Sequence, residues 1–593
     1  MPRSITILLL IAFVLAACAG PSPEITEVID AEPPQQMEEQ VGTEEAQQKE
    51  AEQPLFERPE DVFSMDDLAE ISLPGHPLPV QETALFTGSG NCTNCHQQMT
   101  DAAGNDVSID VMWRGSMMAN SARDPYFRAA MRREVDDLPE YREFIEDKCA
   151  TCHMPIARTS VVSEDGATAV FDQGFYHPDN YLNSLAMDGV SCTVCHQIQP
   201  DNFGQDGSFS GHYLIDTGRP AGTRYVFGPY SVTERRAAIM SGVSKFIPKQ
   251  SPHVDQAELC ATCHTLFTPS IDENDEIVGE FPEQVPYLEW LHSEYRETHA
   301  CQDCHMPPAE GGVILSTTGG ETREPFFKHL FIGANTYILR ILRKHGEELN
   351  VAASSQDFQL KVESTMGQLE QNSAEVAISN LEWQEQTLEV TVDLTSKVGH
   401  KLPSAFPSRR VWIRLVVTDE DGSVIFESGD YRQDGRINQN DNDLDPDSFE
   451  PHYQVITGPE QVQIYEPILG STEGEVTTFL LRANGYIKDN RLLPMGFDKD
   501  TAGEAIRVHG RAVEDPSFQG GGDQVLYRLA LENVSGPITV DVEILMQSIG
   551  YRWADNHRDE AAQESEDFIE YYDQTPNMPV LLARDSAQIN PEE

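Results

Sequence analysis

Hydrophobic and polar residues alternate along several stretches in the second half of the chain. The alternation is clearest at 375–379, 388–394 and 411–418, and 476–481 and 538–546 add further stretches of this kind. Such alternation is typical of strands that bury one face. Asp421-Gly422 separates 411–418 from 423–426 and predicts a hairpin turn. Several short strands with turns between them predict an antiparallel β-sandwich over 353–552, followed by an acidic C-terminal segment at 553–593.

The first half of the chain lacks this alternation. Residues 63–352 show short helical pieces and loops, with one longer helical pattern at 336–349. The predicted fold class is therefore α+β, with a mostly helical or irregular N-terminal domain at 63–352 and the β-sandwich after it.

The N-terminus is predicted to be a targeting segment. Residues 1–17 place one positive charge, Arg3, before an apolar run, which indicates a secretory signal peptide. The run ends in Leu-Ala-Ala-Cys18, which resembles a bacterial lipobox with Cys18 as the lipidated residue. The alternative is an ordinary signal peptide with an incidental cysteine. Ala19 in place of Asp favours an outer-membrane lipoprotein, on the periplasmic face or the cell surface. Residues 18–62 are rich in Glu, Gln and Pro and predict a disordered acidic tether.

The charge balance limits the classes of partner. The 593 residues include 98 acids and 41 Lys and Arg, which gives a net charge of −57. Nucleic acid and anionic lipid are poor partners for such a chain, so membrane attachment would depend on the lipid anchor alone. Electrostatic steering towards basic redox proteins fits the charge, and simple solubility is the alternative explanation. No internal apolar run is long enough to predict a transmembrane helix.

The cysteines give the most specific chemical signal. Apart from Cys18, all of them fall into five copies of Cys-x-x-Cys-His, which are Cys92/Cys95/His96, Cys149/Cys152/His153, Cys192/Cys195/His196, Cys260/Cys263/His264 and Cys301/Cys304/His305. This motif attaches c-type haem: two thiols bind the haem vinyl groups, and the histidine is the proximal iron ligand. Disulfides, zinc ribbons and thioredoxin-like sites do not require a histidine after every second cysteine. The sequence therefore predicts five haem c groups, each with its iron.

The distal ligands are less well defined by sequence. Histidines outside the motifs are numerous enough for a second imidazole at every iron. The candidates are His177, His253, His329 and His400, with Met118 beside Met117 as a thioether alternative that would raise the haem potential. His452 is a further candidate for a link between the two domains. Asp441-Asn-Asp443-Leu-Asp445 fails the EF-hand pattern and is interpreted as an acidic surface loop.

The chain resembles the multihaem c-type cytochromes of bacterial respiratory and extracellular electron transfer. The resemblance depends on the five motifs and on flanking phrases that include Arg123-Asp-Pro-Tyr-Phe127, Pro286-Tyr-Leu-Glu-Trp290, Gly399-His-Lys-Leu-Pro403 and Asp489-Asn-Arg-Leu-Leu-Pro494. It implies electron transfer through a haem array. Pentahaem nitrite reductases resemble the chain in haem count, but their catalytic motif carries Lys where all five motifs here carry His. Hydroxylamine-oxidising relatives carry eight haems.

Three functions follow from these observations. The first is electron transfer by five haems, with no catalytic residue assigned. The second is a catalytic multihaem reductase or oxidase of nitrogen or sulfur compounds, which needs one haem with an open distal site. The third is an electron-conducting subunit of a larger surface complex.

Overall fold

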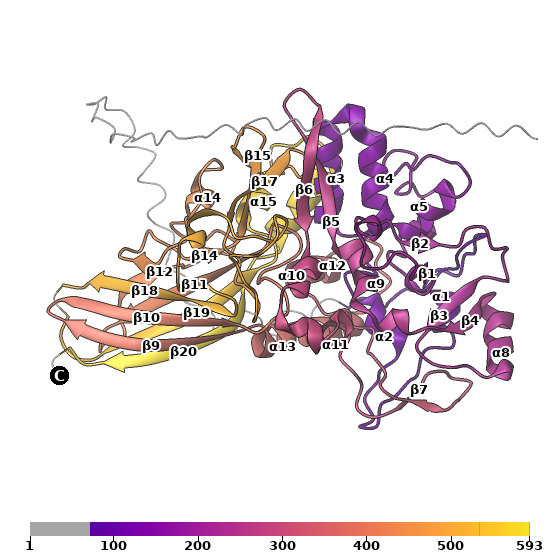
Figure 1. The fold of residues 1–593 in the computed structure, drawn as a ribbon, viewed down its shortest axis with the longest axis horizontal. Helices are drawn as coiled ribbons and strands as arrows, with labels where there is room; N and C mark the ends of the chain where they lie inside the picture. The colour runs from indigo at the N-terminus through magenta and orange to yellow at the C-terminus, as the bar shows by residue number, and fades with distance from the viewer. Residues whose placement is uncertain (1–71, 533, 592–593) are drawn as a thin grey trace, which may run out of the picture. The chain divides into compact units, whose positions relative to one another are not determined.

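The computed structural model describes residues 72–591 apart from residue 533 (Figure 1). It combines helices with mostly antiparallel sheets, so the predicted mixed α+β class is confirmed. The predicted signal peptide, Cys18 and the tether lie outside the described residues. In the described part of the chain, no helix combines the length and the apolar character that crossing a membrane requires.

Short helices dominate the part before residue 352. They are α1 (Gly90–Thr93), α2 (Ile109–Arg114), α3 (Pro125–Asp137), α4 (Arg142–His153), α5 (Pro155–Val162), α6 (Asn183–Ala186), α7 (Cys192–Cys195), α8 (Glu234–Ser244), α9 (Ala257–His264), α10 (Pro286–Leu291), α11 (Cys301–His305) and α12 (Thr336–Lys344). α3 shows how the sequence sets a boundary. The Asp124 carboxylate accepts hydrogen bonds from the backbone N–H groups of Tyr126 and Phe127, and Pro125 occupies the first helical position.

Two-stranded ribbons connect these helices. β1 (Ile198–Gln199) pairs with β2 (Leu214–Ile215), β5 (Leu266–Ile271) with β6 (Ile277–Gln284), and β7 (Val313–Ile314) with β8 (Thr322–Arg323), all antiparallel. β3 (Tyr225–Gly228) and β4 (Ile247–Gln250) are parallel, with α8 as their crossover.

Helix α13 (Ser355–Asn372) leads into the sheets. Its N-terminus has a capping box: the Ser354 hydroxyl accepts a hydrogen bond from the Asp357 N–H, and the Asp357 carboxylate accepts one from the Ser354 N–H. The helix contacts β9 and β20, so it joins the two halves of the chain by packing as well as by sequence.

The second half contains three sheets. One has the order β13 (Val455–Ile456), β18 (Gly522–Ala530), β10 (Thr387–Ser396), β9 (Ala374–Gln384). Another has the order β12 (Val424–Ser428), β11 (Arg410–Thr418), β19 (Ile538–Gln547), β20 (Val580–Ile589), with β14 (Ile464–Tyr465) also paired to β11. The smallest consists of β16 (Val476–Thr477), β15 (Pro467–Ser471) and β17 (Ala483–Asp489).

The first two sheets share one apolar core. Alternate residues of β10, Leu388, Val390, Val392 and Leu394, pack in the same cluster as residues of β11, β18 and β19. β11 was predicted to bury only one face, but nearly all of its residues are buried. Trp412 on its other side packs against Val462 and Ile464, so a second layer covers the face that would otherwise meet water.

The C-terminal residues belong to this architecture rather than forming a separate acidic segment. α15 (Tyr551–Asp555) and α16 (Gln563–Gln574) follow β19, and α16 packs against α3. β20 then pairs antiparallel with β19 and places Val580 and Leu582 in the core. The overall acidic composition of 553–593 hides the alternating pattern of β20, whose buried residues Val580 and Leu582 pack in the core. The segment is therefore a strand of the sheet and not a separate acidic segment.

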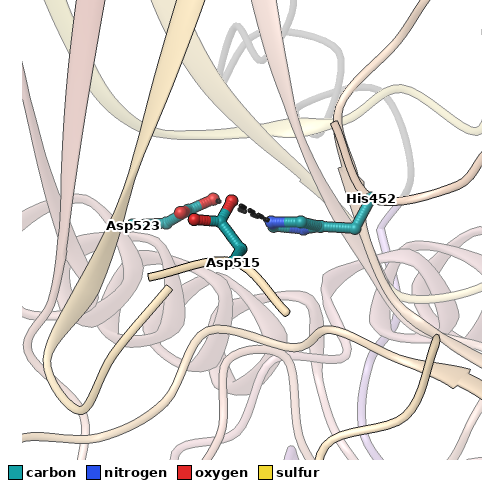
Figure 2. Close-up of side chains that lie close together, drawn as sticks. All are labelled: His452, Asp515 and Asp523. Carbon is teal, nitrogen blue, oxygen red and sulfur yellow. Dashed lines mark hydrogen bonds and ion pairs between the residues drawn. The ribbon is translucent and has the colours of Figure 1, made fainter. Parts of the chain in front are cut away.

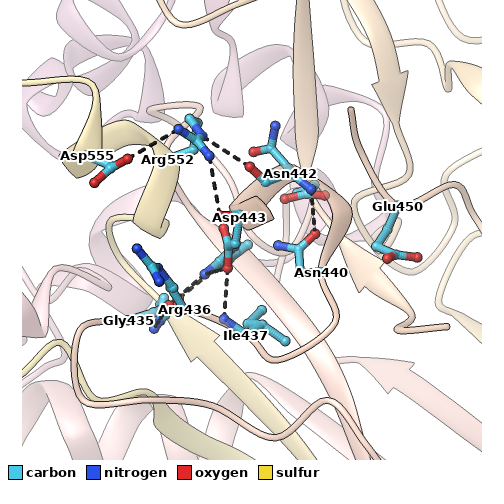
Figure 3. A network of polar contacts seen from close by, with 12 residues as sticks. Gly435, Arg436, Ile437, Asn440, Asn442, Asp443, Glu450, Arg552 and Asp555 are labelled. Carbon is cyan, nitrogen blue, oxygen red and sulfur yellow. Dashed lines mark hydrogen bonds and ion pairs between the residues drawn. The ribbon is translucent and has the colours of Figure 1, made fainter. Parts of the chain in front are cut away.

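The acidic stretch around α14 (Asp441–Leu444) is also only partly a surface loop (Figure 3). Asp443 is buried, and its two carboxylate oxygens accept hydrogen bonds from Arg410 at 2.8 and 2.9 Å. It also accepts a hydrogen bond from the Ile437 N–H. The Arg552 side chain donates to the carbonyls of Asn442 and Asp443. Asp443 is therefore paired inside the protein and fixes this loop against β11.

Candidate haem sites

All five Cys-x-x-Cys-His motifs lie on helical turns. The second, fourth and fifth occupy α4, α9 and α11, while the first and third begin on α1 and α7. Residues spaced by three and four positions share one face of a helix. The two thiols and the histidine of a motif therefore point the same way, as attachment of one flat group requires. None of the ten motif cysteines forms a disulfide.

Backbone carbonyls orient four of the motif histidines. Nδ1 of His96 donates to the carbonyl of Leu315 at 2.7 Å, Nδ1 of His153 to that of Ser121 at 3.2 Å, and Nδ1 of His196 to that of Phe227 at 2.5 Å. His305 makes the same bond to Ile332. Because a carbonyl only accepts, Nδ1 carries the proton and Nε2 is left with a lone pair that could bind a metal ion.

Burial favours the neutral form of the histidine rings near the motifs. Burial lowers the pKa of His153 to about 4 and that of His329 to about 3. Phe127 stacks on the His153 ring with a centroid distance of 3.6 Å, which fixes the plane of that imidazole. Neutral, oriented imidazoles are the form that coordinates a metal.

Two motif histidines face a second imidazole. The ring centres of His196 and His329 are 6.5 Å apart, and those of His305 and His400 are 6.2 Å apart, with planes within about 20° of parallel. A metal ion bound by two opposed imidazoles, at about 2 Å from each ligating nitrogen, separates the ring centres by about 6 Å. Nδ1 of His329 donates to the Phe327 carbonyl and Nδ1 of His400 to the Lys401 carbonyl, so both present Nε2. His196 with His329, and His305 with His400, are therefore the residues that would hold an iron between them.

A cavity of about 760 Å³ joins the first four motifs. Its lining includes cysteines and histidines from all four, together with Gln302 and Met306 beside the fifth. Phe144, Ile239 and Val243 also line it, although they are among the most exposed large apolar side chains of the described residues. Apolar side chains directed into such a cavity suit a large apolar cofactor, so the residues present fit haem.

Neighbouring motifs touch through their thiols. Cys92 lies beside Cys192, Cys152 beside Cys263, and Cys260 beside Cys301. The fourth motif thus contacts both the second and the fifth, and the first contacts the third. The attachment points form a cluster whose order differs from the order of the motifs in the sequence.

A buried group of charges holds His400 in place. The Lys401 ammonium pairs with Asp489 at 2.6 Å, Arg491 pairs with the same carboxylate at 2.8 Å, and Arg491 also pairs with Glu289 at 3.0 Å. Glu289, on α10, accepts hydrogen bonds from the Lys401 N–H and the Ser404 hydroxyl. Burial alone would raise the pKa of Asp489, but Arg491 and Lys401 hold it well below its usual value. The group ties the His400 loop to the helix that precedes the fifth motif.

The remaining distal candidates are placed differently. Both ring nitrogens of His253 are engaged, Nδ1 with the Ser251 hydroxyl and Nε2 with the Ile198 carbonyl, so neither faces a motif histidine. Nδ1 of His177 accepts a hydrogen bond from the Asp179 N–H, which leaves the proton on Nε2. This geometry disfavours both as distal ligands. Met118 and Met117 line the cavity, where a thioether could reach a haem.

His452 lies beside the carboxylates of Asp515 and Asp523 (Figure 2). Its Nδ1 accepts hydrogen bonds from the side-chain amides of Gln463 and Asn490, and its Nε2 donates to Asp515 at 3.1 Å. Asp523 lies 3.8 Å from the same Nε2. The expected link to a haem is wrong, because both nitrogens are held inside the sheet region. With Nδ1 accepting, Nε2 keeps its proton, so this buried His-Asp group is also poorly suited to bind a metal ion.

The sequence did not predict the buried ion pairs among Glu289, Lys401, Asp489 and Arg491, or that they would hold the His400 loop. The phrases that contain Glu289, Lys401 and Asp489 were visible as motifs, but nothing in their spacing showed that they meet. The carbonyls of Leu315, Phe227 and Ile332 carried no signal, because any residue supplies a carbonyl.

No family model and no curated protein matches the chain. Among solved structures, the chain is similar to a penta-heme cytochrome c552 from Thermochromatium tepidum, with a TM-score of 0.48 and 15% sequence identity. The match covers 86% of this chain and 100% of that chain.

Proposed function

We propose that this protein transfers single electrons by means of five covalently bound c-type haems. The observation that carries the proposal is the pair of opposed imidazoles, His196 with His329 and His305 with His400, each beside a Cys-x-x-Cys-His turn and each spaced for one metal ion. Two imidazoles that held one iron would leave it no free site for a substrate, which would favour electron transfer over substrate binding.

The residues have distinct roles in this proposal. The ten motif cysteines attach the haems, and His96, His153, His196, His264 and His305 are the proximal ligands. His329 and His400 are distal ligands. When bound, the haems supply one-electron redox chemistry. The chain orients each imidazole by its Nδ1 bond and surrounds the cofactors with apolar side chains, which together influence the potentials.

The same proposal includes the organisation and location of the chain. Residues 63–352 would form the pentahaem cytochrome domain and the sheets after 353 a β-sandwich that supplies His400. Cys18 would anchor the protein to the outer membrane by lipid alone. A redox protein with a basic docking face is the expected partner near the fifth motif, where Glu294, Glu297 and Asp303 lie close in sequence.

A catalytic reductase or oxidase of nitrogen or sulfur compounds is a second candidate. Within the described residues, His96, His153 and His264 have no second imidazole opposed to them in the way that His329 opposes His196. An iron with an open sixth position can bind a small molecule, whereas Met118 or another cavity methionine would close it.

The test is a haem count followed by spectroscopy of the purified holoprotein. Intact mass and a pyridine haemochrome assay should give five haems per chain. Electron paramagnetic resonance should show at least two low-spin irons with two imidazole ligands each. Fewer than five haems, or no bis-imidazole signal, would contradict the proposal. A high-spin iron that binds CO when reduced would favour the catalytic candidate.

A further inference from the structure

Residues 217–250 carry a net positive charge, opposite in sign to the net charge of the whole chain. They contain six basic residues and one acid, Glu234, in a protein with a net charge of −57. The basic residues are Arg219, Arg224, Arg235, Arg236, Lys245 and Lys249. The segment is a single structural unit, β3–α8–β4, in which two parallel strands are joined by the helix (Figure 1).

Most of these cations lack a carboxylate partner. Arg219 pairs with Asp216 at 3.2 Å, but in the part of the chain that the structure describes, no carboxylate lies within ion-pair distance of Arg235, Arg236, Lys245 or Lys249. Arg219 and Lys249 lie over the same Tyr225 ring, at 4.1 and 4.9 Å from its centre. Arg236 bonds the Gly319 carbonyl. Arg323 joins the group from the neighbouring loop by bonding the Ser231 carbonyl, although it also pairs with Glu321 at 3.4 Å. The positive charge is therefore concentrated and largely uncompensated.

This unit covers the candidate haem sites of the first and third motifs. The Phe227 carbonyl on β3 accepts the Nδ1 bond of His196, and α8 contacts α1 of the first motif. Arg236, Lys249 and Arg323 line the shared cavity. None of the residues of α8 is fully buried. The basic side chains thus lie between solvent and two attachment sites, where a docked partner would come close to both.

We propose that the outer face of β3–α8–β4 is a docking surface for an acidic redox protein, an inference that rests on the proposed electron-transfer function. A macromolecule is the better occupant than a small anion because the exposed cations Arg235, Lys245 and Lys249 are spread over the helix and a strand instead of converging on one point. Charge complementarity then selects an acidic partner and accelerates its association. The acidic sequence around the fifth motif suits a basic partner, so the two regions would differ in the partner that they accept.

The test compares two double variants of the holoprotein. Arg235→Glu with Lys245→Glu reverses two exposed charges that do not line the cavity. Arg507→Glu with Arg528→Glu makes the same change of net charge on exposed residues of the sheet region. The measurement is the second-order rate of reduction by a reduced acidic [2Fe–2S] ferredoxin in stopped flow, at ionic strengths from low to high salt.

The R235E/K245E rate should fall about five- to tenfold at low salt, while R507E/R528E changes less than about twofold, and the difference should disappear in high salt. Equal rates for the two variants would overturn the docking surface. A second result would also overturn it. If R235E/K245E lost binding to phosphatidylglycerol vesicles while its rate of reduction stayed unchanged, the face would contact a membrane and not a protein. The haem count and reduction by dithionite are independent of these rates, so failure of the electron-transfer proposal would be recognised separately.

Discussion

The imidazoles of His305 and His400 oppose each other with their ring centres 6.2 Å apart, although one belongs to a haem motif and the other to the loop after β10. The sheet region therefore contributes directly to a candidate haem site. Its loop is held by Lys401, which pairs with Asp489 in the protein interior. In the proposed function, this relationship makes the second half of the chain part of a haem site, which its strand pattern alone does not reveal.

Replacement of His400 by Ala should change one iron of five. The open axial position should convert that iron from low to high spin, seen by electron paramagnetic resonance and by the absorption bands of the oxidised protein. His299→Ala is the matched control, because His299 is exposed and lies just before the same motif. A low-spin spectrum identical to the wild type in His400→Ala would show that His400 is not a ligand.

Asp489→Asn should destabilise the protein and loosen the His400 loop. The change leaves Lys401 without its carboxylate and Arg491 with Glu289 alone, and removing one partner of a buried ion pair costs about 3–5 kcal/mol. The denaturant midpoint should fall, and the iron at His305 should show a mixed spin state. Asp447→Asn, at an exposed carboxylate, should change neither measurement.

Glu134 should make stability depend on pH. Its carboxylate is buried and accepts hydrogen bonds from the N–H groups of Leu480 and Leu481, and burial raises its pKa to about 7 from an ordinary value of 4.5. The folded state then binds more protons than the unfolded state between these two values. The contribution of Glu134 to stability is therefore greatest below about pH 4.5, falls as the pH rises to about 7, and then stays level.

Glu134→Gln should remove this dependence. The variant should be more stable than the wild type at pH 8, by up to about 3 kcal/mol, and the advantage should vanish near pH 4.5. Urea unfolding at a series of pH values measures the difference, and exposed Glu140→Gln is the control. A constant difference across the series would mean that Glu134 does not titrate in this range.

Calcium and chelators should leave the sheet region unchanged. Arg410 neutralises Asp443, and the proton on Nε2 of His452 points at Asp515, so neither acidic group offers a prepared cation site. Millimolar Ca²⁺ or EDTA should not move the unfolding midpoint. A rise of the midpoint with Ca²⁺ would contradict this assignment.

The sequence by itself determined the chemistry of attachment and most of the local structure. The five Cys-x-x-Cys-His motifs give candidate ligands because two thiols and an imidazole at fixed spacing need only one helical turn, and the structure supplies that turn. The alternating strands of β10 and β19 were predicted for the same reason, since alternation is a local property.

Only the tertiary structure decided which residues meet across the chain. It placed His400 beside His305 and His329 beside His196, engaged both ring nitrogens of His253 and of His452 in hydrogen bonds, and added β20 to the sheet. Such contacts depend on packing between segments far apart in sequence, and a histidine in isolation gives no sign of the partner that its two nitrogens will find. The chemistry of each site is therefore local, whereas its second ligand and its surroundings follow from the fold.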